Sequence, residues 1–143
     1  MRPSAIEPVS VLVVDDSAII RQRLRALLAE ADHIRWVGEA GSRAEAWTLF
    51  GQIHPEVVLL DLCLPDGSGL ELLCRIKQAV SSCLVIVLTN SRESIFRHEC
   101  QRCGADHFLH KATEFEQVVD LLHHHANRRD PEDSALRTPT LTP

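Results

Sequence analysis

Several apolar runs of this sequence end in a polar group that could take part in phosphoryl chemistry. These groups are three carboxylates, one hydroxyl and one ammonium: Asp15, Asp16, Asp61, Thr89 and Lys111. Three carboxylates held close together repel one another and raise one another's pKa unless a cation lies among them. An oxygen-only ligand set suits a hard divalent ion that keeps several waters, and it therefore predicts Mg²⁺. Beside such an ion, Asp61 could act as a nucleophile and become an aspartyl phosphate.

The element that precedes Asp61 decides how this carboxylate is presented. Four consecutive apolar residues, 57–60, lead into Asp61, and Pro65 and Gly67 follow within six positions. A core helix could contain the same apolar run, but the β-branched pair Val57-Val58 and the Pro/Gly boundary favour a strand. Open α/β sheets place their chemistry at the carboxyl ends of parallel strands. The competing interpretation, a solvated Asp that opens a turn, is the commoner case for an isolated acidic residue.

Strands and helices are predicted to alternate along the chain. Apolar runs predict five strands, at 9–14, 34–40, 57–60, 84–88 and 106–110. Helical spacing of apolar residues predicts five helices: one capped by Ser17, one over 44–50 that stops at Gly51 and Pro55, one over 73–80, one from Phe96 to Gly104, and one that begins with a capping box at Thr113–Glu116. This alternation predicts a parallel sheet with helices on both faces, whose strand ends share one edge.

Residues 9 to about 126 resemble the receiver domain of two-component response regulators, of the single-domain type. The resemblance depends on an ordered set of motifs: the acidic pair after the first strand, Asp61 followed by Pro65 and Gly69, Thr89, and Gly104-Ala105-Asp106-x-Phe108-x-x-Lys111. Each motif is weak alone, whereas the ordered set is specific. The fold expected from the resemblance is α/β, with a five-stranded parallel doubly wound sheet and five helices (flavodoxin-like, strand order 2-1-3-4-5).

The resemblance implies how the group of carboxylates is used. Asp61 is the expected phosphoacceptor, in a Mg²⁺-dependent transfer from a sensor histidine kinase or a histidine phosphotransfer protein. Asp16, Asp61 and the backbone carbonyl of Cys63 are expected to bind the Mg²⁺ ion. Asp15 is expected to hold the same ion through water. No other cofactor and no conventional enzymatic activity are expected beyond phosphorylation and dephosphorylation of Asp61.

The resemblance also implies a switch. Lys111 is expected to pair with the phosphoryl group, Thr89 to move toward it, and Phe108 to turn inward. A downstream protein partner is then expected on the face made by the fourth helix, fifth strand and fifth helix. Two residues depart from the family pattern. Ala112 follows the lysine where the family often has a cis-proline, and a cis bond there would cost about 2.5 to 4 kcal/mol. Phe108 lacks the hydroxyl of the tyrosine that many members have.

Composition limits the other functions that the chain could have. Its 143 residues suit one domain, which we place at 9–127, between an N-terminal extension (1–8) and a disordered tail (128–143). The net charge of -5 argues against direct binding of nucleic acid. No apolar segment is long enough for membrane insertion, and a cytoplasmic location is expected. The five cysteines are expected to be free thiols, with Cys100 and Cys103 on the apolar face of a helix with Phe96.

Three other interpretations compete with this one. Haloacid-dehalogenase phosphatases need Asp-x-Asp after the first strand, but here the two acids are adjacent. A flavodoxin-type cofactor site needs a phosphate loop rich in Gly and hydroxyl groups, and residues 15–19 do not form one. The third alternative is a receiver-like interaction module that is not phosphorylated. Phosphate transfer from acetyl phosphate to the protein would separate it from a working receiver.

Overall fold

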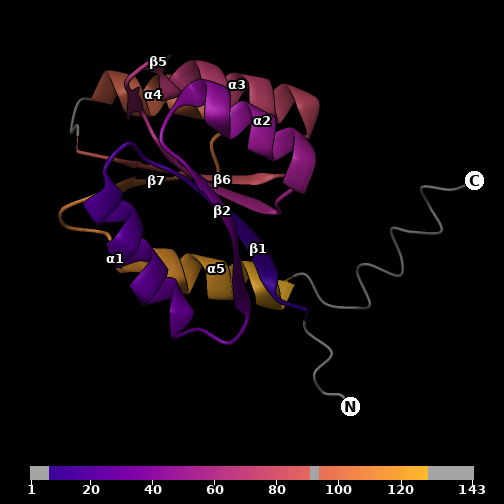
Figure 1. Ribbon diagram of the computed structural model, residues 1–143. Coiled ribbons are helices and arrows are strands. Elements are labelled where there is room, and N and C mark those ends of the chain that lie inside the picture. The colour runs from indigo at the N-terminus through magenta and orange to yellow at the C-terminus, as the bar shows by residue number, and fades with distance from the viewer. Residues whose placement is uncertain (1–6, 91–93, 129–143) are drawn as a thin grey trace, which may run out of the picture.

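The structure is a computed structural model that describes residues 7–90 and 94–128 (Figure 1). Within these residues, five parallel strands form one sheet in the order β2-β1-β3-β6-β7. The strands are β1 (Val9–Val14), β2 (Ile34–Ala40), β3 (Val57–Asp61), β6 (Leu84–Thr89) and β7 (His107–His110). Counted within this sheet alone, the order is 2-1-3-4-5, which confirms the predicted flavodoxin-like fold.

Helices cover both faces of the sheet (Figure 1). On one face lie α1 (Ala18–Ala29) and α5 (Gln117–Arg128), and on the other lie α2 (Arg43–Ile53), α3 (Gly69–Ala79) and α4 (Ser94–Arg102). Each face has its own cluster of buried apolar side chains. Because β1 and β3 are buried on both faces, every residue of each strand is buried, and their sequences are almost continuously apolar instead of alternating.

A two-residue hairpin that the sequence analysis did not predict follows β3. It consists of β4 (Cys63–Leu64) paired antiparallel with β5 (Gly67–Ser68). The chain then returns close to Asp61: the Gly69 N–H donates to the Leu62 carbonyl at 2.8 Å. A Cβ atom on Gly69 would overlap the Asp61 carbonyl oxygen. Glycine at this position therefore allows α3 to begin directly against the end of β3.

Several predicted helix limits are wrong, and α3 and α4 begin four and two residues earlier than predicted, at Gly69 and Ser94. Helix α2 does not stop at Gly51 but continues to Ile53, and His54 follows in a left-handed conformation with φ 54°. One glycine costs a helix only about 1 kcal/mol relative to alanine. Helix α5 begins at Gln117, not at a Thr113 capping box. The Glu114 carboxylate instead accepts the His110 N–H at 2.7 Å, so it closes the turn after β7. The same helix includes Arg128, which we had placed in the tail.

The cysteines are not all free thiols. Cys74 of α3 and Cys103, directly after α4, form a disulfide, so the prediction is wrong for these two residues. No sequence pattern indicates this pair, because the packing of α3 against α4 brings together two cysteines that are 29 positions apart. Cys100 is fully buried, as expected, whereas Phe96 of the same helix is 40% exposed and does not share the predicted apolar face.

The limits of the domain remain a prediction. Apart from residues 7 and 8 and Arg128, the proposed N-terminal extension and tail lie outside the described residues. Among the helices that the structure describes, none combines the length and the apolar composition that a membrane span requires.

Candidate functional site

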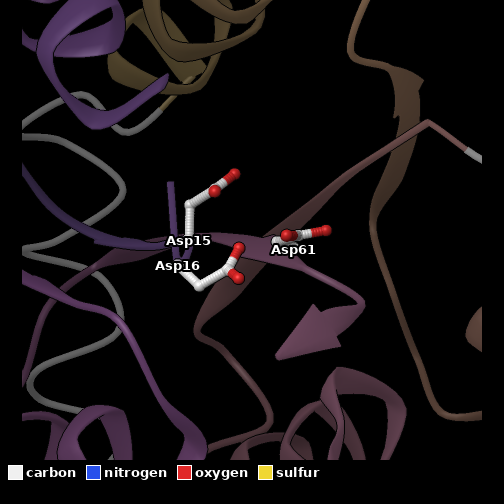
Figure 2. A group of neighbouring side chains, drawn as sticks. All are labelled: Asp15, Asp16 and Asp61. Atoms are coloured by element: carbon white, nitrogen blue, oxygen red, sulfur yellow. The ribbon is translucent and has the colours of Figure 1, made fainter. Parts of the chain in front are cut away.

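Three carboxylates meet at the carboxyl-terminal edge of the sheet (Figure 2). Asp61 is the last residue of β3, and Asp15 and Asp16 directly follow the neighbouring strand β1. Carboxylate oxygens of all three lie within 4.8 Å of one another. Asp15 and Asp61 are buried, with 2% and 5% of their surface exposed, while Asp16 faces solvent. The parallel sheet thus brings together residues that are 46 positions apart in the sequence, counted from Asp15 to Asp61.

The Lys111 ammonium lies between two of these carboxylates. Its Nζ is 2.5 Å from Asp15 Oδ2 and 3.1 Å from Asp61 Oδ2. The backbone of Lys111 is fixed as well, because its N–H donates to the Thr89 carbonyl at 2.9 Å. Burial alone would lower the pKa of Lys111, but the hydrogen bond to Asp15 and the charge of Asp61 outweigh burial and raise it. Lys111 is therefore held in its charged form.

The carboxyl group of Asp61 is in a less favourable environment. Burial raises its pKa, and the negative charge of Asp15 adds to that rise. The ammonium of Lys111 and the Cys63 N–H, which donates to Asp61 Oδ1 at 3.2 Å, lower the pKa without cancelling the effect of burial. One ammonium shared between two buried carboxylates leaves negative charge uncompensated. A second cation among Asp15, Asp16 and Asp61 would compensate it.

The donor set fits Mg²⁺. All three side chains offer carboxylate oxygens, which hard divalent cations prefer, and exposed Asp16 leaves the site open to water. Cys63 lies two residues after Asp61 at the start of the hairpin, with its side chain exposed. That the backbone carbonyl of Cys63 binds the metal remains a prediction.

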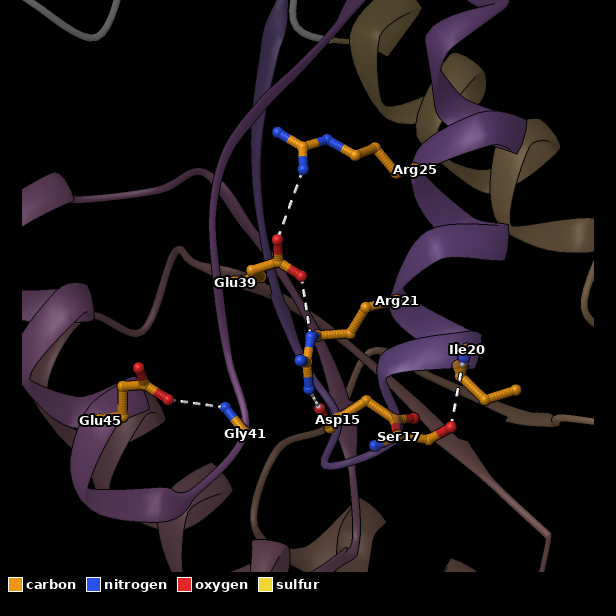
Figure 3. Close-up of polar contacts among 8 residues, drawn as sticks. All are labelled: Asp15, Ser17, Ile20, Arg21, Arg25, Glu39, Gly41 and Glu45. Carbon is orange, nitrogen blue, oxygen red and sulfur yellow. Dashed lines mark hydrogen bonds and ion pairs between the residues drawn. The ribbon is translucent and has the colours of Figure 1, made fainter.

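A network of polar contacts fixes the turn between β1 and α1 (Figure 3). The Ser17 N–H donates to Asp15 Oδ1 at 2.9 Å, and Ser17 Oγ accepts the Ile20 N–H at 3.2 Å, so Ser17 caps α1 as predicted. Arg21 donates to the Asp15 carbonyl at 2.6 Å and forms an ion pair with Glu39 of β2 at 2.8 Å. This contact of Arg21 was not predicted from the sequence. The position of this residue one turn after the helix cap was the available indication.

The two predicted switch residues, Thr89 and Phe108, lie on the neighbouring strands β6 and β7. Thr89 ends β6 and is 1% exposed, and Leu88, just before it, pairs with Asp61 of β3. Phe108 of β7 is half-buried and packs against the core cluster under α2, α3 and α4. The Arg97 guanidinium of α4 lies over the Phe108 ring, 5.2 Å from its centroid, and donates to the Phe108 carbonyl at 3.3 Å.

A hollow of about 300 Å³ lies next to Phe108, between α4, β7 and α5. Its lining includes Arg97 and Cys100 of α4, Phe108 of β7 and Leu121 of α5. Phe108 thus pairs with Val87 of β6 and also lines this recess. A change in the position of its ring would alter the shape of that recess.

Comparison with known proteins identifies the family. The family model of the response regulator receiver domain matches residues 11–123. This chain is a receiver domain of that family. Receiver domains take part in two-component signal transduction, where they accept phosphoryl groups from kinases.

Relatives of this receiver domain include regulators with longer chains. The nitrate/nitrite response regulator NarL of Escherichia coli K12 is 31% identical over 135 residues, which are 94% of this chain and 62% of NarL. The transcriptional regulatory protein PhoP of Escherichia coli O157:H7 is 33% identical over 109 residues, 76% of this chain and 48% of PhoP. The receiver domain therefore spans about half to two thirds of these relatives. The crystal structure of the response regulator domain of Thermotoga maritima CheB superposes with a TM-score of 0.74, at 27% identity, over 85% of this chain and 96% of that domain.

Proposed function

We propose that this receiver domain accepts a phosphoryl group on Asp61 in a Mg²⁺-dependent reaction and passes the change to a protein partner. The donor in this proposal is a sensor histidine kinase or a histidine phosphotransfer protein. The arrangement that supports it best is Asp61 at a strand end, with two further carboxylates within 4.8 Å and the Lys111 ammonium 3.1 Å away. Few structural roles would require two buried carboxylates to share one lysine beside a third carboxylate.

Asp15, Asp16 and Asp61 are the side chains that would hold Mg²⁺. When bound, the ion neutralises part of the phosphoryl charge and orients the phosphoryl oxygens. Asp61 supplies the attacking oxygen: a bond forms between this oxygen and phosphorus while the bond from phosphorus to the donor nitrogen breaks. For this role Asp61 must be ionised, and the metal and Lys111 both favour the ionised form over the protonated one.

In this proposal, Lys111 binds a phosphoryl oxygen. Its ammonium is charged, buried and fixed through its backbone to Thr89. A donor held in position before the reaction stabilises developing charge without the cost of reorganisation. We infer that Lys111 exchanges its contact with Asp61 for one with the phosphoryl group while Asp15 keeps it in place.

Output would leave through Thr89 and Phe108. A phosphoryl group on Asp61 would attract the Thr89 hydroxyl from the neighbouring strand, and Phe108 would move inward into the space that Thr89 vacates. The hollow between α4, β7 and α5 would change shape, and this is the face where we place the protein partner. In this proposal the chain occupies the cytoplasm, does not itself bind nucleic acid, and has no catalytic activity beyond the turnover of its own phosphate.

The test is phosphorylation of the purified protein by acetyl phosphate, followed by intact-mass measurement. One phosphoryl group per chain is expected with Mg²⁺ and none after chelation, because the incoming charge would face three carboxylates. Asp61→Asn should not be labelled. Asp120→Asn, the same change at an exposed position on α5, is the matched control and should be labelled like wild type. Absence of labelling in wild-type protein that remains folded would favour an interaction module that is not phosphorylated.

A further inference from the structure

Two cysteines that are far apart in the sequence meet where α3 packs beside the end of α4. Cys74 lies in the middle of α3, and Cys103 directly follows α4. Their sulfurs are bonded and their Cα atoms are 5.0 Å apart, within the range that a disulfide requires. Both residues are partly exposed, so that small thiol reagents can reach them.

The other three cysteines differ from this pair. Burial raises the pKa of the Cys83 thiol to about 12 and that of the Cys100 thiol to about 11. Both thiols therefore stay protonated near neutral pH, where a thiol is a poor nucleophile. Cys63 is exposed, but it lies just after the carboxyl end of β3. Cys103 lies before the amino end of β7, at the opposite edge of the parallel sheet. The geometry thus singles out Cys74 and Cys103 as exchange partners, and burial disfavours Cys83 and Cys100 as competitors.

The junction between α3 and the end of α4 also has noncovalent contacts. Lys77 of α3 forms an ion pair with Asp106 at 2.8 Å, and the same carboxylate oxygen accepts the Val85 N–H at 2.8 Å. Gly104 turns the chain after α4 with φ 100°, so close to Lys77 that a Cβ would lie 3.3 Å from its Cγ. Because these contacts do not depend on the disulfide, the reduced chain is expected to keep the same fold.

We propose that Cys74 and Cys103 are a reversible thiol–disulfide pair that fastens the end of α4 to α3 under oxidising conditions. One thiolate attacks a small disulfide of the glutathione class, which gives a mixed disulfide and releases one small thiol. The second thiolate then displaces the other small thiol and forms the bond between Cys74 and Cys103. Two protein thiols and one small disulfide become one protein disulfide and two small thiols.

The consequence concerns the mobility of α4. This helix contributes Arg97 and Cys100 to the hollow beside Phe108. A covalent link at Cys103 removes conformations in which the end of α4 moves away from α3. The oxidised protein should therefore hold this wall of the hollow more rigidly than the reduced protein does.

Peptide mapping tests the chemical part of the proposal. The full chain is equilibrated in mixtures of oxidised and reduced glutathione, alkylated, and cleaved after Arg, Lys and Glu. Cleavage after Glu71 and Arg75, and after Arg102 and Lys111, places Cys74 and Cys103 on separate short peptides without another cysteine. We expect these two peptides linked in oxidising mixtures and both alkylated in reducing ones. Linkage through Cys63 or Cys100, or alkylation in every mixture, would overturn the proposal.

Hydrogen exchange of the unphosphorylated protein tests the mechanical part. Amides in the last turn of α4 should exchange at least about tenfold more slowly in the oxidised protein, because local opening must now work against a covalent link. Cys74→Ser and Cys103→Ser should abolish the difference, and the control Cys63→Ser should retain it. Equal exchange in oxidised and reduced wild type would refute the proposal. Asp61 takes no part in these measurements, so their failure would leave the proposed phosphorylation untouched.

Discussion

Lys111 Nζ lies 3.1 Å from Asp61 Oδ2, and the side chains of both residues are more than nine-tenths buried. The same ammonium also contacts Asp15. Among the residues that the structure describes, Lys111 is the only lysine or arginine whose side chain forms ion pairs with Asp15, Asp16 or Asp61. Its charge is needed for folding as well as for the proposed chemistry, because buried carboxylates without a counter-charge are costly.

Lys111→Met should therefore destabilise the protein. Removing one partner of a buried ion pair typically costs about 3 to 5 kcal/mol, and urea unfolding at neutral pH without Mg²⁺ measures this cost. Added Mg²⁺ should recover part of the loss, since it places positive charge among the same carboxylates. Arg102→Met removes an exposed ion pair with Glu99 and is the matched control, with an expected change below about 1 kcal/mol. Equal effects of the two substitutions would contradict the electrostatic account of the site.

The pKa of Asp61 predicts how stability depends on pH. Because the pKa of Asp61 is raised in the folded state, its carboxyl group loses its proton at a lower pH in the unfolded chain than in the folded one. Between these two pKa values, the free energy of unfolding falls as pH increases. Asp61→Asn lacks this cost. In the absence of Mg²⁺ the variant should be more stable than wild type at neutral pH, and the difference should shrink as pH falls toward the ordinary carboxyl pKa of about 4. Thermal melts across this range measure it, with Asp120→Asn as control. If the stability difference between Asp61→Asn and wild type instead grows as pH falls, the pKa of Asp61 is not raised by folding.

Two glycines with different surroundings test how α3 is placed against Asp61. Gly69→Ala should cost about 1 to 3 kcal/mol, because the new Cβ would overlap the Asp61 carbonyl oxygen and shift the strand end. Gly51→Ala, in a helix with open space around it, should stabilise by about 0.5 to 1 kcal/mol. Urea unfolding separates the two. If Gly69→Ala is as stable as wild type, the tight packing of the hairpin and α3 against Asp61 is not required.

The coupling of the site to the surface depends on Thr89. With beryllofluoride as a phosphoryl mimic, amide resonances of α4, β7 and α5 should shift in wild type. In Thr89→Ala these shifts should fall severalfold while resonances around Asp61 still respond, because a ligand displaces an equilibrium only by its differential affinity for the two states. Equal shifts of α4, β7 and α5 in both proteins, or no shifts there in wild type, would exclude this route.

Residues at strand ends could be located from the sequence because the apolar runs that precede them are fully buried. Asp15, Asp61 and Thr89 each complete or directly follow such a run, and parallel strands place all of these ends at one edge. Features that depend on contacts between distant segments could not be located in this way. Arg21 contacts both the Asp15 carbonyl and Glu39, which β2 brings beside α1 from a distant part of the sequence. Thr113 and Glu116 have the spacing of a capping box, but α5 begins only at Gln117, and the Glu114 carboxylate accepts the His110 N–H in the turn before it.

We expect Asp61, and no other carboxylate, to receive the phosphoryl group. Borohydride reduction of the phosphorylated protein converts an acyl phosphate to an alcohol, which changes the mass of the modified residue permanently. Fragmentation of the tryptic peptides then identifies that residue. Asp61 and Asp66 lie in the peptide 44–75, and Asp15 and Asp16 lie in a separate peptide that ends at Arg21. We expect the reduced residue at position 61 alone, and only in samples phosphorylated in the presence of Mg²⁺. Reduction at Asp15, Asp16 or Asp66, or an unmodified Asp61 in protein that carries phosphate, would contradict the account.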